Sequence, residues 1–399
     1  MTMLREYLGF KPTMASFAAG LLGAFPRDQV DQWTLDCARK TITHRSGGEI
    51  ALGNIFLEYC SNKVSTRAGL IRKYADLANT VSSEIPALWA AAARYVYPVV
   101  RSMFVDTTVR IQTRLDPVRN VAAAMPLTGD LQVRLVYDFG SYLTYVSETQ
   151  LATWGQTMAD VLERAVANLA RLDRPEWVAS RHGYLQLASP MSFAESMLLL
   201  GNIVDELPFK EFAVLLPCNR GLLLAADGRS EQALQAMLRE ASRCAEHEPW
   251  PMTATLCARS GGSWHEFITA GETARLAHNL FVSHRADFYA AQKEALDNFH
   301  ALAEKDVFTA TCSVLERDDT RVSSCVWSQG VVSLLPVTDW IALLPDAADA
   351  DFKHVRWQRM LEVCGDRLQP TGESPVRFLV ESFPDSTQWE ALVAEPLEI

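Results

Sequence analysis

Four histidines and one carboxylate in the last third of the sequence have residue types that could bind a metal. His265, His278, His284 and His300 lie there, and Asp287 follows His284 at a spacing that places both on one helix face. Imidazole and carboxylate groups are ligands of zinc and iron. However, neither H-x-x-x-H nor H-E-x-x-H occurs. We therefore interpret these residues as solvated helix histidines, and we expect neither a metal nor another cofactor.

A candidate nucleophile lies in the segment Ser260–Glu266, where two serines precede His265 around a pair of glycines. The members of a catalytic triad meet in space from distant segments, rather than as sequence neighbours. The sequence also lacks the nucleophile elbow G-x-S-x-G and the glycine-rich phosphate-binding patterns. We favour a surface turn here, and the catalytic residues stay unknown.

Carboxylate pairs are a third candidate for chemistry. Asp318-Asp319 has the composition of a hairpin turn, whereas Asp205-Glu206 and the pair Asp349 and Asp351 fall at loop edges. General acid–base catalysis requires two carboxyl groups that face one substrate, which sequence spacing does not establish. Aromatic residues are also frequent in the last third, and we expect them mainly in the core: Trp264, Trp327, Trp340, Trp357 and Trp389.

The clearest structural pattern lies between Gly129 and Leu172. Apolar residues alternate with others from Leu131 to Tyr137, which predicts a half-buried strand, and 142–146 predicts a returning strand. Ser147 can then cap one long amphipathic helix that continues to Leu172. We expect Leu135 and Leu162 to be buried on the apolar faces of this strand and this helix.

The same strand–strand–helix order is predicted around residues 40–59 and 212–241. The three units are either a diverged repeat or one common motif used independently. Further helices are predicted over residues 30–37, 88–96 and 193–204, and strands alternate with helices after residue 286.

These patterns predict an α+β fold in three parts. Residues 1–127 form a mainly helical region with a short β-hairpin, and residues 128–250 form a central α+β domain. Residues 251–399 form a carboxy-terminal α+β domain with an antiparallel meander. Pro249, Pro251 and the glycines of the segment Ser260–Glu266 mark the second boundary.

Composition favours a folded cytoplasmic protein. The chain has 399 residues, of which 49% are hydrophobic, and no apolar run approaches the length of about 20 residues that a membrane span needs. Residues 15–25 are apolar, but the polar Arg27-Asp28-Gln29 that follows favours a buried helix over a signal peptide. The eight cysteines form no C-x-x-C pair and are expected to be reduced thiols.

Charge is unevenly distributed along the chain. Residues 1–127 carry 15 Lys and Arg against 10 Asp and Glu, whereas residues 128–399 carry 22 against 38, so that the net charge of −11 comes from the second part. This acidic majority argues against nucleic-acid binding. It is compatible with a protein partner that has a basic face, although surface charge can also drift without function.

Residues 35–245 carry three motifs that resemble a known family. The first motif is Ala51–Tyr59 followed by Arg67. The second is Gly129-Asp-Leu131 through Tyr137-Asp138, with Tyr145-Val-Ser147 and Ala167-Asn-Leu169, and the third is Leu215–Arg220 followed by Leu222–Leu224. In these segments the chain resembles the YtpQ-like family of bacterial proteins. The resemblance implies a cytoplasmic α+β protein and assigns no reaction.

The sequence therefore favours a non-catalytic protein–protein interaction module, such as an adaptor, assembly or chaperone-like subunit of a bacterial complex. The alternative is a hydrolase or metal-dependent enzyme with its site in residues 260–399. A deep pocket with two or more histidines and a carboxylate would favour the enzyme, whereas an exposed apolar patch would favour the interaction module. A protein partner is expected, a membrane is not, and a small-molecule ligand stays open.

Overall fold

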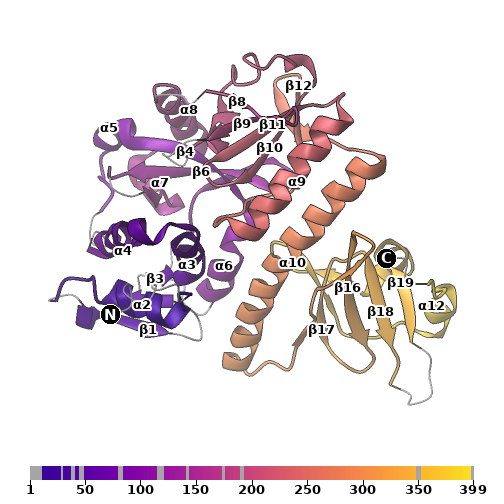
Figure 1. Ribbon diagram of the computed structural model, residues 1–399. Coiled ribbons are helices and arrows are strands. Elements are labelled where there is room, and N and C mark those ends of the chain that lie inside the picture. The colour runs from indigo at the N-terminus through magenta and orange to yellow at the C-terminus, as the bar shows by residue number, and fades with distance from the viewer. Residues whose placement is uncertain are drawn as a thin grey trace.

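The computed structural model describes residues 11–27, 30–36, 41–44, 49–79, 84–114, 121–140, 143–172, 176–188, 193–346 and 352–396. It is an α+β protein, which confirms the predicted class. An amino-terminal part, a central part with two sheets and a carboxy-terminal lobe are arranged around one long helix, α10 (Gly271–Leu302), which runs from the central part to the lobe (Figure 1).

The amino-terminal part packs helices on a small antiparallel sheet of order β1-β2-β3. Its core contains Phe17, Leu21, Ile42, Leu52 and Tyr59. The predicted hairpin is present, but the helix predicted at 30–37 is wrong, because this segment pairs with β2 as a strand. The elements are α2 (Met14–Leu22), η1 (Val30–Gln32), β1 (Trp33–Asp36), β2 (Thr41–His44), β3 (Glu49–Ala51), α3 (Leu52–Ser61) and α4 (Val64–Asn79).

The first central sheet has the order β4-β6-β5, with β7 also paired to β6. Leu135 is fully buried in β6, as predicted. The helix predicted at 88–96 is short, and Pro98 lies in the edge strand β4, where its missing N–H is tolerated. The elements are α5 (Trp89–Ala92), η2 (Ala93–Tyr95), β4 (Val96–Ser102), η3 (Met103–Asp106), α6 (Thr107–Thr113), β5 (Ala124–Thr128), β6 (Leu131–Asp138) and β7 (Leu143–Tyr145).

The long helix predicted after Ser147 is two helices, α7 (Glu148–Trp154) and α8 (Met158–Leu169). Gly155 ends α7 in the left-handed conformation, with φ of 63°, and Thr157 caps α8 through a capping box with Asp160. This break rotates the buried face onto Val161, Ala165 and Leu169, so that Leu162 is only partly buried, contrary to prediction.

The second central sheet has six strands in the order β13-β12-β10-β11-β9-β8. Helix α9 (Glu231–His247) covers one face through Leu234, Met237 and Leu238. The helix predicted at 193–204 is wrong. This segment contains one short 3-10 helix, η4, which is followed by turns. The elements are β8 (Val178–Ala179), β9 (Leu185–Ala188), η4 (Glu195–Leu199), η5 (Lys210–Phe212), β10 (Ala213–Asn219), β11 (Leu222–Asp227), β12 (Cys257–Ser260) and β13 (Ser263–Glu266).

At both predicted domain boundaries, a strand on one side is hydrogen-bonded to a strand on the other side. Strand β4 precedes residue 127 and pairs with β6, and β12 follows residue 251 and pairs with β10. The central part therefore extends from about α5 to β13. The three strand–strand–helix units lie in three separate sheets.

The carboxy-terminal lobe contains two four-stranded sheets of order β15-β16-β18-β19 and β14-β17-β21-β20. The predicted antiparallel meander is wrong, because β17 leaves for the second sheet and β16 then pairs with β18 in parallel. The elements are β14 (Phe308–Thr309), β15 (Ser313–Arg317), β16 (Thr320–Ser328), β17 (Ser333–Pro336), β18 (Trp340–Leu344), β19 (Lys353–Arg356), α11 (Trp357–Cys364), η6 (Gly365–Arg367), β20 (Gln369–Pro370), β21 (Arg377–Val380) and α12 (Ser386–Ala391).

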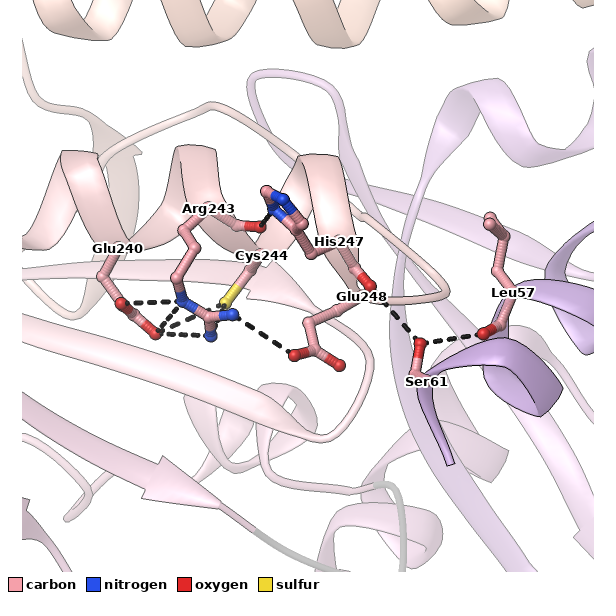
Figure 2. A network of polar contacts seen from close by, with 7 residues as sticks. All are labelled: Leu57, Ser61, Glu240, Arg243, Cys244, His247 and Glu248. Carbon is pink, nitrogen blue, oxygen red and sulfur yellow. Dashed lines mark hydrogen bonds and ion pairs between the residues drawn. The ribbon is translucent and has the colours of Figure 1, made fainter. Parts of the chain in front are cut away.

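The carboxyl end of α9 joins the amino-terminal part to the central part. Figure 2 shows Arg243 paired with Glu240 and Glu248 there. It also shows the Ser61 hydroxyl of α3, which donates to the carbonyl oxygen of Leu57 at 2.8 Å and lies 3.4 Å from the carbonyl oxygen of His247. Cys244 lies beneath Arg243. The seven cysteines among the described residues are free thiols, and Cys37 lies outside these residues.

Within the described residues, no helix combines the length and the apolar character that crossing a lipid bilayer requires.

Candidate functional site

The predicted histidines lie on α10 and β13, but the structure does not bring them together as one site. His265 is exposed on β13, His278 pairs with Asp339, and His284 and His300 are buried. The interpretation of solvated helix histidines is therefore wrong for His284 and His300. The reason is that α10 is packed on several sides, against α9 near Leu280 and against α6 and β17 near Leu296.

His284 is the strongest of the predicted metal ligands, and its geometry is that of a packed side chain. Its ring meets that of Phe288 at 4.9 Å, and its Nε2 atom has no hydrogen-bond partner. Burial lowers the pKa of His284, so that the ring stays neutral. The charges of Asp130 and Asp287 raise this pKa, but burial outweighs them. Among the described residues, no group of three or more His, Cys, Asp or Glu side chains could hold a metal ion.

We predict that purified protein contains no stoichiometric zinc or iron. The reason is that His284 and His300 are buried at different places along α10, and that His278 is already paired with Asp339. The measurement is elemental analysis of protein that was never exposed to chelators. About one metal per chain, lost in His284→Ala, would contradict this prediction and promote the enzyme alternative.

The segment Ser260–Glu266 contains the predicted turn, at Gly261 and Gly262 between β12 and β13, and its remaining residues belong to these strands. Ser260 pairs with Ser263 across the hairpin, and Gly261 and Gly262 both adopt positive φ. Asp318-Asp319 is likewise the turn between β15 and β16. Asp205-Glu206 lies in exposed turns, and Asp349 and Asp351 lie outside the described residues.

A cavity of about 70 Å³ lies between α10 and the carboxy-terminal lobe. Phe281, Val282, Arg285 and Tyr289 of α10 form one side of it. The other side comes from the lobe. Val337, Thr338 and Asp339 of the turn between β17 and β18 line it, together with Cys312 and Ser323. Sequence reasoning missed this site because its residues come from one helix and three separate lobe segments.

Asp339 anchors α10 to the lobe at the edge of this cavity. Its Oδ2 atom accepts from the backbone N–H of Ser323 at 2.7 Å and from the Ser323 hydroxyl at 2.8 Å. His278 Nε2 lies 3.3 Å from the same oxygen. The serine therefore contacts the carboxylate, and not the histidine as a nucleophile–base pair would require.

The pair of His278 and Asp339 should make stability depend on pH. The hydrogen bond to Asp339 raises the pKa of His278 above 6.5, although burial opposes this effect. Burial raises the pKa of Asp339, but bonds from His278 and Ser323 outweigh it and hold that pKa below 3.8. The stabilisation is therefore fully present between about pH 4 and pH 6.5. It is lost as pH rises through the raised pKa of His278, and as pH falls through the lowered pKa of Asp339.

We predict that His278→Gln destabilises the protein by about 1 kcal/mol or less near pH 5.5, since both groups are partly exposed. The difference from wild type should shrink above pH 8. Thermal melts at both pH values measure it, with the exposed His265→Gln as control. A difference that is equal at the two pH values would show that the imidazolium is not involved.

A second polar cluster is buried in the central part and was not predicted. Arg101 of β4 bonds to Glu195 at 2.5 Å, and the other carboxylate oxygen of Glu195 accepts from the N–H of Gly221 at 2.7 Å. Arg134 pairs with Asp106. Arg101, Arg134 and Glu195 are at most 4% exposed. The cluster links β4, β6, η4 and the β10–β11 turn.

Tyr145 reaches this cluster from β7. The guanidinium of Arg134 lies 5.1 Å from its ring centre. Burial raises the pKa of Tyr145, but Arg101, Arg220 and Arg134 together outweigh burial and hold it below 10. The charge of Arg220 lies over the Trp250 ring at 4.5 Å. The arginines come from distant elements of the chain. Arg134, Tyr145 and Arg220 lie within the motifs noted above, but nothing in the sequence indicated that they meet.

The sheet β15-β16-β18-β19 has an outer face that turns away from the lobe core. Residues 326, 342 and 354 form one row across it, residues 328 and 344 are paired in the next, and Phe352 directly precedes β19, with its ring 5.1 Å from that of His354. Val326, Leu344 and Phe352 are exposed on this face. Trp340 is buried on it beneath the guanidinium of Arg356, 4.2 Å from the ring centre.

The other predicted aromatic residues lie in cores. Trp327 and Trp357 belong to the core of the carboxy-terminal lobe, and Trp389 packs against it. Trp264 packs partly buried between the two central sheets. Comparison with family models, curated proteins and solved structures gave no match to this chain.

Proposed function

We propose that this chain is a non-catalytic protein–protein interaction module, an adaptor, assembly or chaperone-like subunit of a bacterial cytoplasmic complex. The observation that carries the proposal is the outer face of the sheet β15-β16-β18-β19. Val326 and Leu344 are 40% and 38% exposed on the neighbouring strands β16 and β18 of one face, and Phe352, 55% exposed, directly precedes β19. Contiguous exposed apolar side chains of this kind are typical of protein interfaces. The resemblance to the YtpQ-like family stays part of the proposal.

The charge of the lobe supports a particular kind of partner. Residues 303–399 contain 17 Asp and Glu against 8 Lys and Arg, which gives this lobe a net charge of −9. An apolar patch within an acidic lobe fits a partner surface with an apolar centre and a basic rim. Opposite charges accelerate the encounter, and apolar contacts then determine the lifetime of the complex.

The enzyme alternative would place its site in residues 260–399, where the cavity lies. Its lining residues include one carboxylate, Asp339, and no histidine, although His278 reaches that carboxylate. This set does not meet the condition of two histidines and a carboxylate in one pocket. It supports ligand binding better than hydrolysis.

Photo-crosslinking from the proposed surface tests this function. A photoreactive amino acid is placed at Val326 and, separately, at Leu344, in the full chain in a bacterial host. Val178, which is 56% exposed on β8, serves as the matched control position. We expect both lobe positions to capture the same basic protein and the control position not to capture it.

Binding of the purified partner then gives the decisive numbers. Leu344→Arg should weaken binding, whereas Val178→Arg should not, with thermal melts to verify folding. The association rate of wild type should fall about tenfold or more from low to high salt. A rate that is flat across the salt series would contradict the charge argument. A partner that contacts only residues 1–127 would contradict the surface itself.

A further inference from the structure

The cavity between α10 and the carboxy-terminal lobe contains one cation without a matching anion. The Arg285 guanidinium lies 5.2 Å from the ring centre of Phe281 and 5.6 Å from that of Tyr289. Its only hydrogen bond among the described residues is the long contact of 3.5 Å to the Tyr289 hydroxyl, and its buried Nε has no partner. No described carboxylate forms an ion pair with it. Arginine has five N–H donors, so most of them are available to a ligand.

The other polar groups of the cavity are already occupied or neutral. Asp339 accepts two hydrogen bonds from Ser323 and pairs with His278, as described above. The Thr338 hydroxyl donates to the carbonyl oxygen of Trp340 at 2.7 Å. Burial raises the pKa of the Cys312 thiol to about 11, so that this thiol is neutral at physiological pH. While His278 is protonated and neutralises Asp339, the charge of the cavity that has no ion pair is therefore that of Arg285.

The shape and polarity of the cavity narrow the class of anion. A cavity of about 150 Å³ holds one benzene molecule with its six non-hydrogen atoms, so the 70 Å³ found here accommodates roughly three. This is the size of a carboxylate group, and the end of the alkyl part of a longer ligand would extend toward the open side of the cavity. Val282 and Val337 supply apolar walls, and Asp339 disfavours an anion with two charges. Phe281 is 39% exposed, so the cavity reaches the surface beside its ring. A planar carboxylate also matches the fork of a guanidinium in two parallel hydrogen bonds.

We propose that this cavity binds a small monocarboxylate. Its carboxylate group pairs with the guanidinium of Arg285, and its short alkyl part contacts Val282 and Val337. The ligand fills the contact between α10 and the lobe. This inference is independent of the interaction surface proposed above, which lies on β16 and β18.

The test is a titration of the full chain with sodium propionate, followed by the backbone amide signals of Thr338 and Asp339 in NMR spectra. Sodium chloride and sodium phosphate at matched ionic strength are the reference salts. We expect saturable shifts with propionate, and a Kd that is about tenfold or more weaker in Arg285→Gln. Arg285→Lys retains the charge without the planar fork and should be intermediate.

The control variant is Arg317→Gln, because Arg317 is exposed in the same lobe and lies outside the cavity. It should bind propionate like wild type. A tripeptide with a free carboxyl terminus, compared with its amidated form, distinguishes a chain end from a free acid as the source of the carboxylate. The proposal is overturned if propionate gives no saturable shift, if phosphate binds equally well, or if Arg285→Gln leaves the Kd unchanged.

Discussion

Replacement of Arg377 by methionine should destabilise the protein by about 4 kcal/mol or more, because it removes buried hydrogen bonds that nothing else can replace. Arg377 is fully buried in β21. It donates to Gln292 Oε1 at 2.5 Å and to the carbonyl oxygens of Ala310, Leu334 and Tyr289 at 2.7, 3.0 and 3.1 Å. It thereby joins α10, the loop after β14, and β17. Burial lowers its pKa to about 10, so that the charge is retained at neutral pH.

Urea unfolding measures this loss, and hydrogen exchange locates it. Amides of the carboxy-terminal lobe should lose protection in Arg377→Met before those of the central part, since the contact between α10 and the lobe is what breaks. The stability of Arg377→Lys should lie between that of wild type and that of Arg377→Met, because lysine retains the charge but cannot reach four acceptors. The matched control is Arg359→Met on the exposed side of α11, which should change stability by less than about 1 kcal/mol. A stability of Arg377→Met equal to that of this control would contradict the prediction.

Glu195→Ala should cost about 3–5 kcal/mol, since it leaves the buried charge of Arg101 without a counterion. It also removes the acceptor for the N–H of Gly221 and so affects the β10–β11 turn. The measurement is again urea unfolding, with Glu163→Ala on the exposed face of α8 as control.

The double variant Arg101→Met with Glu195→Leu provides the diagnostic comparison. Buried ion pairs can be replaced by apolar residues at much lower cost than the removal of one partner. We therefore expect the double variant to be more stable than Glu195→Ala. If the double variant is less stable than either single replacement, the pair contributes through its hydrogen bonds to neighbours rather than through compensation of charge.

Sequence patterns predicted local elements well where one physical signal was dominant. The alternation around Leu135 identified β6, and Asp318-Asp319 identified a turn. The break between α7 and α8 was missed although its signals are local, since Gly155 and Thr157 are typical residues for ending one helix and capping the next. The apolar periodicity continued across the break and concealed it.

The candidate sites were beyond such reasoning for a different reason. Nothing in the sequence indicates that Arg101 and Arg377 are buried, because the sequence does not show that Glu195 or Gln292 will lie beside them. The parallel pairing of β16 with β18 likewise depends on β17 leaving for another sheet. Each of these features depends on contacts between segments that are far apart in the chain.

The 32 residues of α10 also have a mechanical consequence. At 1.5 Å per residue this helix is about 48 Å long. Its first turns are fixed to α9 through Leu276 and Leu280, and its last turns reach Leu334 in the lobe through Leu296. A tilt of about 10° at the α9 end would therefore move the other end by about 8 Å, as a lever does. Arg285 lies near the middle of this lever, between the end fixed to α9 and the end that reaches the lobe. A ligand in the cavity would therefore act part-way along the lever and limit how far the lobe swings.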